Sequence, residues 1–507
     1  MNTVQAVMSL HKTALHEKII KNAFLGNRGI TLPMSAFTEA EMNKIKKDLW
    51  MKPFVPKGMK TQDTNEFPVY RESTSKLYVP RFYIYNMLSD VGYAEPWKYI
   101  PSKLNTAASI DVPFKGTLRD FQVPIVEAYM TEVKRSGCGL LELMCAAGKT
   151  VLSLYIASQL KMKTIVIVHK EFLLNQWVER IQEFLPTARI GRLQGQVLDI
   201  EDKDIVIAML QSLSMKDYPL SLFSSFGLSI FDECHHISAE VFCRSLFKVV
   251  TPYVLGLSAT MNRKDGLTKL FKMFLGNIVY SKLTRDEDYN VQIRNIHYSN
   301  DDKDYSDVIY NYMGQIHHSI MIKRICEYSP RSEFILKVLA DLLKEESRHQ
   351  VMILAHNKSL LKYLYTAIEN RNIAKVGYYV GGMKEKDLKD TADNKQVVIA
   401  TYAMAEEALD IKTLSALIMA TPRADVTQAV GRILRMKHEY RPIVVDIVDE
   451  HDVFHSQWEK RKGFYKKNSY EMVELSHEEY LSNTPWRTIK VKTSKPQTLS
   501  NTCLIKL

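Results

Sequence analysis

Short apolar runs alternate with longer amphipathic stretches between about residues 111 and 450. The runs are rich in valine and isoleucine and are continuously apolar, which is typical of strands buried on both faces of a parallel sheet. Glu333–Leu343, in contrast, places its apolar residues on one helical face. This alternation predicts a doubly wound α/β fold. The predicted strands are Thr164–Val168, Asp204–Ala208, Leu228–Phe231, Val351–Leu354, Val397–Ala400, Ala416–Ala420 and Ile443–Val445.

Polar, charged sequence near residues 283–300 separates two such series of strands. We therefore expect two tandem α/β domains, at residues 111–284 and 285–470, joined by a linker in that stretch. Residues 1–110 are rich in aromatic residues and proline, which indicates a small N-terminal accessory domain. Residues 471–507 are expected to form a loose basic tail, because the chain after residue 480 has five basic residues and no acidic one.

Length and composition place the chain among soluble globular proteins. It has 507 residues, of which 46% are hydrophobic, so it can bury more than one core. Lys and Arg outnumber Asp and Glu by 68 to 57, and the net charge of +11 fits a polyanionic partner without requiring one. The apolar runs are far shorter than the roughly 20 residues that cross a bilayer. We expect an intracellular protein with no membrane partner.

The six cysteines are scattered and form no C-x-x-C pair. Such spacing predicts neither a zinc site nor an iron–sulfur cluster. Scattered thiols in a long chain also favour a reducing compartment over a disulfide framework.

An apolar strand leads into a loop of small residues and then into a helical pattern, as in a phosphate-binding loop. We expect Lys149 to reach the β- and γ-phosphates of ATP, and the Thr150 hydroxyl to ligate Mg²⁺. The match is incomplete, because the strict pattern has glycine where Leu143 stands; an incidental strand–turn–helix is the alternative. The loop residues expected to bind the nucleotide are Leu143, Met144, Cys145, Ala146, Ala147, Gly148, Lys149 and Thr150.

Asp232 and Glu233 directly follow the apolar run Leu228–Phe231, so both carboxylates leave a strand at its C-terminal end. An ATPase needs such a pair. Asp232 would hold Mg²⁺, and Glu233 would orient and deprotonate the attacking water. A surface acidic pair is the alternative, but with the loop upstream the pattern predicts an ATP hydrolase that uses ATP and Mg²⁺.

These motifs, in this order, resemble those of the superfamily 2 DExH-box helicases. The similar group lies around XPB, the phage UvsW helicase, and the poxvirus transcript-release helicase with its African swine fever virus counterpart. The resemblance covers roughly residues 111–450 and implies two tandem RecA-like domains that hydrolyse ATP between them. The segments that carry it are Leu118–Gln122, Asp232–His235, Ser258–Thr260, Arg263–Gly266, Ile399–Ile411 and Gln428–Arg435, the last of which matches Q-x-x-G-R-x-x-R completely.

The resemblance also implies roles for single residues. Arg432 and Arg435 lie at i and i+3 and would reach the γ-phosphate as forked donors. Further nucleotide contacts are implied for Arg119, Gln122, Asp410 and Gln428, with Gln122 at the adenine edge. His169 and Lys170, with Leu173–Trp177 after them, resemble a segment that touches the nucleic-acid backbone, as does the stretch around Gln211 and Ser212; ordinary strand-end loops are the alternative for both. The residues implied to contact nucleic acid or to couple it to ATP are His169, Lys170, Gln211, Ser212, His235, Ser258, Thr260 and Thr401.

Some positions depart from the family pattern. Alanine replaces the usual glycine at Ala146 and Ala408, and Met261 stands where relatives have proline. These substitutions keep open a nucleic-acid-binding scaffold with a decayed ATPase site, although the charged residues of the motifs are all present.

The resemblance implies an ATP-dependent DNA helicase or translocase that moves 3′ to 5′ and acts in viral transcription. A viral protein of this kind would work in the host cytoplasm, in the viral factory, and could be packaged in the virion. DNA is the expected partner, together with transcription machinery. An RNA helicase and a double-strand DNA translocase without strand separation stay open, because the sequence identifies no strand-separating hairpin.

Overall fold

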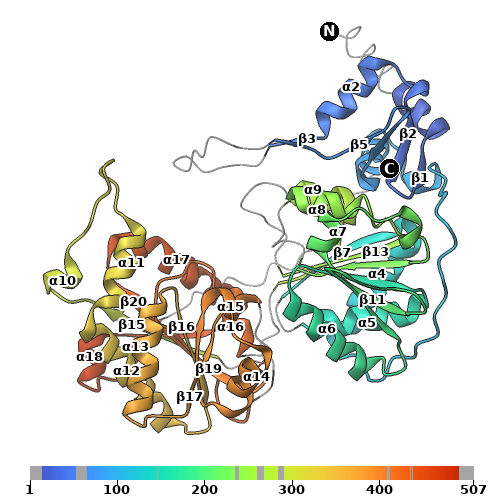
Figure 1. Ribbon diagram of the computed structural model, residues 1–507. Coiled ribbons are helices and arrows are strands. Elements are labelled where there is room, and N and C mark those ends of the chain that lie inside the picture. Colours follow the sequence, from blue (N-terminus) through green and yellow to red (C-terminus); the bar gives the residue numbers. More distant parts are fainter. Residues whose placement is uncertain are drawn as a thin grey trace. The chain divides into compact units, whose positions relative to one another are not determined.

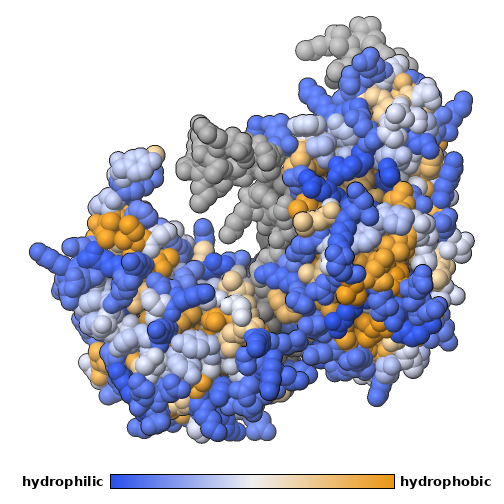
Figure 2. All heavy atoms as spheres, viewed as in Figure 1, coloured by the Kyte–Doolittle hydropathy of each residue, from blue (hydrophilic) through white to orange (hydrophobic). Residues whose placement is uncertain are grey.

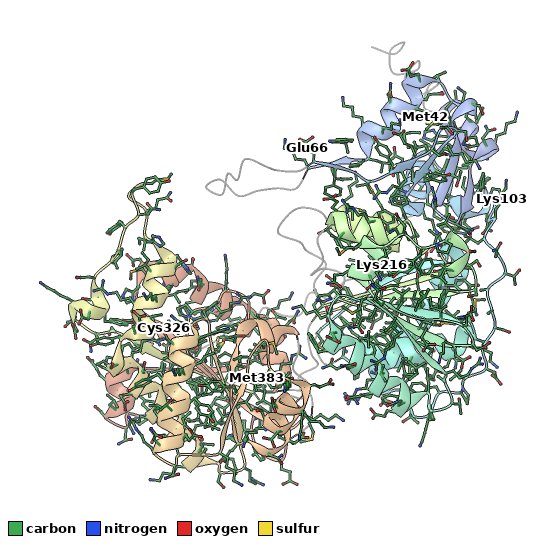
Figure 3. The ribbon with its side chains drawn as sticks, in the orientation of Figure 1. Met42, Glu66, Lys103, Lys216, Cys326 and Met383 are labelled. Atoms are coloured by element: carbon green, nitrogen blue, oxygen red, sulfur yellow. The ribbon has the colours of Figure 1, made fainter. Side chains whose placement is uncertain are left out.

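The computed structural model describes residues 14–52, 66–144, 147–233, 239–259, 268–283, 291–407, 411–433, 436 and 438–489. The chain divides into two compact units, residues 1–283 and 284–507 (Figure 1). Each unit is built on an eight-stranded, mostly parallel sheet with flanking helices, which confirms the predicted fold class. Figure 3 shows the side chains that fill the space between sheet and helices in each unit.

The N-terminal part of the first unit begins with a helix over residues 14–22. Its remaining elements are β1 (Phe24–Gly26), β2 (Gly29–Pro33), η1 (Met34–Ala36), α2 (Glu39–Asp48), β3 (Trp50–Met51), β4 (Phe67–Pro68), β5 (Arg71–Glu72), β6 (Lys76–Val79), α3 (Arg81–Ser89) and η2 (Pro96–Lys98). An antiparallel sheet has the order β1-β2-β6-β5, and β3 pairs with β4. Thr38 begins α2 through a capping box with Glu41, which satisfies two backbone N–H groups at the helix start.

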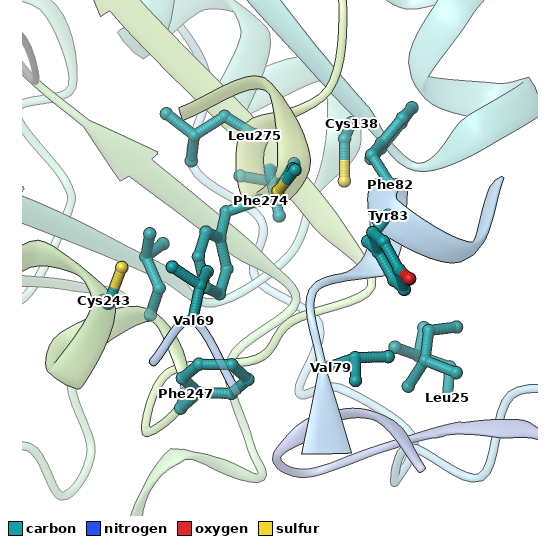
Figure 4. Close-up of a cluster of buried hydrophobic side chains, with 14 of the residues drawn as sticks. Leu25, Val69, Val79, Phe82, Tyr83, Cys138, Cys243, Phe247, Phe274 and Leu275 are labelled. Atoms are coloured by element: carbon teal, nitrogen blue, oxygen red, sulfur yellow. The ribbon is translucent and has the colours of Figure 1, made fainter. Parts of the chain in front are cut away.

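This N-terminal part shares one hydrophobic cluster with the larger sheet of its unit. Figure 4 shows the side chains that meet there, among them Leu25, Val79, Phe82, Phe247, Phe274 and Leu275. Arg81, at the start of α3, is buried and donates to the carbonyls of Thr251 and Pro252 at 2.6 and 3.1 Å. The two parts of the first unit are therefore joined by a continuous core and by a buried guanidinium.

The larger sheet of the first unit has the strand order β10-β9-β11-β8-β12-β13-β7-β14. The predicted strands Thr164–Val168 and Leu228–Phe231 are confirmed residue for residue, and the third is shifted by one position. The elements are η3 (Asp120–Gln122), α4 (Val123–Ser136), β7 (Cys138–Leu143), α5 (Lys149–Leu160), β8 (Thr164–Val168), α6 (Glu171–Phe184), β9 (Ile190–Gln194), β10 (Val197–Asp199), β11 (Ile205–Met209), α7 (Leu210–Met215), η4 (Leu220–Phe223), β12 (Leu228–Phe231), α8 (Ala239–Leu246), β13 (Tyr253–Ser258), α9 (Thr268–Leu275) and β14 (Ile278–Lys282).

The sheet of the second unit has the order β17-β18-β16-β19-β20-β15-β21-β22. All four predicted strands occur, and the predicted helical face of Glu333–Leu343 is buried within α12. The elements are β15 (Gln292–Tyr298), α10 (Lys303–Ser306), α11 (His318–Glu327), α12 (Ser329–Glu345), β16 (Gln350–Ala355), α13 (Lys358–Asn370), β17 (Val376–Tyr379), α14 (Glu385–Asn394), β18 (Val397–Thr401), α15 (Tyr402–Glu407), β19 (Leu414–Met419), α16 (Thr427–Arg432), β20 (Ile443–Asp449), α17 (Asp452–Lys467), β21 (Glu471–Ser476), α18 (His477–Leu481) and β22 (Arg487–Thr488).

Two parts of the chain are more ordered than the sequence suggested. β15 lies inside the expected linker of residues 283–300, yet it pairs with β20 and β21 within the second sheet. Its polar residues misled the prediction because they have partners: Arg294 bonds Glu345, and Asn295 donates to the Val473 carbonyl. The expected tail begins with β21, α18 and β22, which extend the same sheet; residues 490–507 lie outside the described residues.

A buried ion pair lies at the end of β20. Arg331 in α12 donates two hydrogen bonds to Asp449, at 2.6 and 2.7 Å, and both side chains are fully buried. The Tyr305 hydroxyl donates to the same carboxylate at 3.0 Å. A buried charge without its partner is costly, so this pair fixes how α12 and β20 meet.

Replacing Arg331 with Met should lower the free energy of unfolding by about 3–5 kcal/mol, because Asp449 is left as an uncompensated buried charge. The double variant Arg331→Met/Asp449→Leu removes both charges and should recover most of that loss. Arg371→Met is the matched control, since Arg371 also forms a two-point ion pair with Glu333 but on the surface; it should cost less than about 1 kcal/mol. Denaturant unfolding followed by circular dichroism measures all three, and equal stability of the two single variants would contradict the prediction.

Candidate active site

The candidate residues of the first unit gather along the carboxyl edge of its sheet. The strands β7, β13, β12, β8 and β11 are parallel neighbours in that order. Their ends carry, in turn, the phosphate loop, Ser258, Asp232, His169 and the start of α7. Ligands of open α/β sheets bind at this edge. The topology thus brings together residues that are far apart in the sequence.

The phosphate loop joins the end of β7 to α5, which begins at Lys149. Gly148 precedes the helix with a φ of 78°, in the left-handed region that favours glycine. A Cβ atom at this position would also lie 2.5 Å from Nε2 of Gln122. The left-handed φ therefore favours glycine at position 148, and a larger residue would also displace the amide group of Gln122. Cys145 and Ala146 lie outside the described residues.

Gln122 is buried against the phosphate loop. Its Nε2 donates to the Ala147 carbonyl at 3.0 Å, and its Oε1 accepts from the Arg119 backbone N–H at 2.9 Å. The amide therefore ties the segment before α4 to the loop. The second hydrogen of this amide nitrogen could be donated to adenine. The adenine contact of Gln122 and the nucleotide contact of Arg119 stay predictions.

Lys149 and Glu233 form an ion pair, with Nζ and Oε1 2.6 Å apart. The two side chains are only 11% and 19% exposed, so water and salt screen the pair less than a surface pair. Glu233 has a φ of 46°, a left-handed conformation that costs a non-glycine residue about 1–2 kcal/mol. The turn after β12 therefore holds the Glu233 carboxylate beside the lysine of the phosphate loop. This position agrees with the predicted role of Glu233 as the base that deprotonates water.

Asp232 is buried beside this pair, and Nε1 of Trp177 donates to its Oδ2 at 2.8 Å. Burial, together with the neighbouring carboxylate of Glu233, raises the pKa of Asp232 to about 6. Lys149 and the Trp177 hydrogen bond act in the opposite direction. A cation next to Asp232 would therefore stabilise the ionised carboxylate, which burial and Glu233 destabilise.

Trp177 corrects one implication of the family resemblance. The segment Leu173–Trp177 was expected to touch the nucleic-acid backbone, but Trp177 is 1% exposed and bonds Asp232. Its place is in the nucleotide site, where it orients a carboxylate. A tryptophan on the apolar face of a helix is usually a core residue, so this hydrogen bond could not be predicted from the sequence pattern.

The described residues among those implied for nucleic-acid contact lie at or near strand ends in both units. Gln211 donates through Nε2 to the His169 carbonyl at 2.8 Å, and Ser212 Oγ accepts from the Gly195 N–H at 2.9 Å. Ser258 is fully buried at the end of β13, and Thr401 ends β18. Lys170 begins α6 as its N-cap. His235 and Thr260 lie outside the described residues.

In the second unit, Arg432 closes α16 and is 8% exposed. Its Nε donates to the Ala405 carbonyl at 2.9 Å, which fixes the direction of the guanidinium. Gln428 lies in the same helix, whereas Asp410 and Arg435 lie outside the described residues. The roles of these residues toward the nucleotide stay predictions.

None of the described helices is long and apolar enough to cross a membrane. Within the described ranges, no group of three or more His, Cys, Asp and Glu side chains could hold a metal ion. Nucleotide-bound Mg²⁺ needs fewer protein ligands, because phosphates and water supply the rest. The buried carboxylate of Asp232, with its raised pKa, and the hydroxyl of Thr150 at the start of α5 fit that requirement.

Comparison with known proteins agrees with this geometry. Residues 115–263 match the family "Type III restriction enzyme, res subunit", and residues 335–437 match "Helicase conserved C-terminal domain". A protein of Acanthamoeba polyphaga mimivirus, named as a candidate ATP-dependent RNA helicase, is 30% identical over 466 residues, which cover 89% of this chain and 86% of the relative. The chain belongs to the superfamily 2 helicases. It is an ATP-hydrolysing enzyme that binds nucleic acid.

Two other helicases are similar over shorter stretches. An African swine fever virus protein, also named as a candidate ATP-dependent RNA helicase, is 26% identical over 361 residues, 66% of this chain and 70% of its own. A DNA 3′-5′ translocase of the XPB type from Sulfurisphaera tokodaii is 34% identical over 188 residues, 36% of this helicase and 41% of its own chain. The solved structure of Saccharomyces cerevisiae Dbp5 with RNA shares the fold, with a TM-score of 0.50, 12% identity, and coverage of 71% of this chain and 91% of that one.

The pKa of Asp232 should control Mg²⁺–nucleotide affinity. A protonated carboxyl group binds Mg²⁺ poorly, so affinity should be full at neutral pH and fall as the pH drops through about 6, the pKa before the nucleotide binds. Trp177→Phe removes a hydrogen bond that lowers this pKa, so its affinity should begin to fall at a higher pH. Binding of a fluorescent ATP analogue across a pH series measures the midpoint. Trp458→Phe, in the second unit, is the control; an unchanged midpoint in Trp177→Phe would contradict this role.

Proposed function

We propose that this helicase couples ATP hydrolysis at Lys149, Asp232 and Glu233 to 3′-to-5′ movement along DNA. The ion pair of Lys149 and Glu233 beside the buried Asp232 is the observation that carries the proposal. A phosphate-binding cation, a metal-binding carboxylate and a second carboxylate for the water are the groups that phosphoryl transfer requires.

The ion pair also suggests how ATP prepares the site. The phosphates of ATP would compete with Glu233 for Lys149, since both are anions. Lys149 would then neutralise the phosphates while Asp232 and Thr150 hold Mg²⁺, and Glu233 would accept the proton of the attacking water. Arg432 and Arg435 would stabilise the charge that develops on the transferred phosphoryl group.

The nucleic-acid track would run along the carboxyl edges of the two sheets. His169, Lys170 and Gln211 in the first unit, and Thr401 in the second, lie at such edges. Loops at these positions hold phosphates without reading bases, so little sequence preference is expected. ATP hydrolysis would then change the affinity of these loops for the strand.

Two relatives favour different nucleic acids. DNA is supported by the archaeal relative, which is named a DNA 3′-5′ translocase and has the higher identity, and by the segment Arg263–Gly266 that resembles the XPB group. RNA is the second candidate, because the mimivirus relative named for RNA matches much more of the chain. The mimivirus and African swine fever virus relatives are named as helicases of viruses. We further propose, on the resemblance to viral helicases alone, that this chain acts in viral transcription in the host cytoplasm and is packaged in the virion.

Glu233→Gln should turn ATP over about 10²–10⁴-fold more slowly, because the amide cannot accept the proton of water. Its affinity for ATP should be equal or higher, since the carboxylate that competes for Lys149 is gone. Lys149→Ala should lose both hydrolysis and affinity. Steady-state ATPase and nucleotide-binding measurements separate the two variants, and a Glu233→Gln enzyme with normal turnover would show that the base is another residue.

Single-stranded DNA should stimulate the ATPase more than RNA of the same sequence. On an oligonucleotide with streptavidin at one end, the enzyme should displace streptavidin from the 5′ end and leave it at the 3′ end. Binding should weaken with salt along a log–log line of slope about 0.7 per phosphate contact. Stronger stimulation by RNA would favour the second candidate, and displacement from the 3′ end would reverse the proposed direction.

A further inference from the structure

A short hairpin between α10 and α11 of the second unit exposes large apolar side chains to water. Tyr312 is 92% exposed, and Met313 and Tyr310 are 65% and 60% exposed. No other large apolar side chain in the described part of the chain is as exposed as Tyr312. In Figure 1 this segment is the yellow projection above α11, and Figure 2 shows it with a pale tip and an orange patch at its base.

The backbone of the hairpin tip is fixed by local hydrogen bonds. The N–H of His317 donates to the Ile309 carbonyl, and the N–H of Asn311 donates to the Gln315 carbonyl, both at 2.7 Å. The side-chain oxygen of Asn311 also accepts from the N–H groups of Met313 and Gln315, at 2.9 and 3.0 Å. The aromatic side chains are therefore presented on a closed turn.

The root of the hairpin rests on the buried ion pair of Arg331 and Asp449. Tyr305, before the hairpin, bonds Asp449 through its hydroxyl, and its carbonyl lies 2.9 Å from Nε2 of His451. After the hairpin, the ring of His318 packs edge-on against Phe454 in α17, with centroids 5.6 Å apart. These contacts fix the positions of the chain on both sides of the hairpin.

The hairpin rises from the carboxyl edge of the second sheet. It follows β15, whose last residue, Tyr298, pairs with Asp449 at the end of β20. Thr401 ends the parallel strand β18 at the same edge of this sheet. The tip thus lies on the side of the unit where the proposed nucleic-acid track runs.

The charge pattern of the segment favours bases over phosphates as its partner. Residues 308–322 contain no Lys, Arg, Asp or Glu. The seven residues before them carry four aspartates (Asp301, Asp302, Asp304 and Asp307) against one lysine, Lys303; of the two basic residues that follow, Arg324 pairs with Asp307. Carboxylates repel a phosphate backbone, and the tip offers no cation to attract it. Aromatic rings instead stack on bases, which contributes about 1–3 kcal/mol per base whatever the sequence.

We propose that the hairpin of residues 309–317 is a base-stacking pin, with Tyr312 packing against the end base pair where paired strands meet single strands. The inference rests on the proposed function and extends it, because the pin would turn movement along a strand into strand separation. Because the proposed stacking partner is the end base pair of a duplex, which a single strand lacks, the pin would contribute little to the affinity for single strands; that affinity comes mainly from charge.

Stacking can be tested without ATP hydrolysis, on a forked DNA with 2-aminopurine at the junction. Wild-type protein should change the fluorescence of this base, and Tyr312→Phe, which keeps the ring, should do the same. Tyr312→Ala should leave the fluorescence as in free DNA at saturating protein. Tyr99→Ala is the matched control, since Tyr99 is an exposed tyrosine, 44% exposed, in the N-terminal part.

Unwinding gives the second readout. Tyr312→Ala should keep its single-strand affinity and its DNA-stimulated ATPase, yet unwind the fork about 10- to 100-fold more slowly, as the loss of one stacking contact implies. Tyr312→Phe and Tyr99→Ala should unwind like wild type.

A fluorescence change that persists in Tyr312→Ala would overturn the pin. Unwinding by Tyr312→Ala at the wild-type rate would overturn it too, and that is the result expected if the tip docks on a protein instead. Loss of DNA-stimulated ATPase in this variant would assign the tip to strand binding rather than separation. If wild-type protein showed no nucleic-acid-stimulated ATPase, the proposed function would fall, while the 2-aminopurine measurement would still decide the stacking contact.

Discussion

The burial of parallel strands on both faces is the constraint on which this structure depends. Residues within β8 and β12 have no room for a charged side chain, because each face of the sheet is covered. At these two strands, charged residues therefore occur only beyond the strand ends. Asp232 and Glu233 follow β12 at its carboxyl end, and Lys149 lies just beyond the end of β7. The chemistry of the first unit is therefore confined to one edge by the same burial that stabilises the sheet.

Two ion pairs, Arg331–Asp449 and Lys149–Glu233, differ in how deeply they are buried and therefore in whether their partners can be exchanged. Arg331 and Asp449 are fully buried and joined by two hydrogen bonds, so removing either partner leaves a charge with no water to compensate it. Lys149 and Glu233 are joined by one short contact and remain partly exposed. In the proposed reaction, an anionic phosphate would replace Glu233 at Lys149, and partial contact with water would lower the cost of that exchange. The first pair is suited to hold elements together, and the second to change partners during a reaction.

The sequence predicted those parts of the fold in which one pattern dominates. Continuous apolar runs located β8 and β12 to the residue, because a strand buried on both faces tolerates little else. β15 was missed since Arg294 and Asn295 interrupt its apolar pattern, and their partners, Glu345 and the Val473 carbonyl, are distant in sequence. The bond of Trp177 to Asp232 was missed for a related reason. Periodicity assigns a residue to a buried face, but it does not say which polar atom that face meets.

The two kinds of tyrosine around the hairpin show what sequence could not distinguish. Tyr305 is buried and donates its hydroxyl to Asp449, and burial raises the pKa of this phenol. Tyr312, seven positions later, is 92% exposed. Burying a large apolar side chain contributes about 1.5–3 kcal/mol, and the fold forgoes this gain at Tyr312, Tyr310 and Met313. Since the hydrogen bonds of Asn311 and the root at Asp449 fix the hairpin without these side chains, its stability does not require them. These three side chains are therefore available for the stacking contact that we propose.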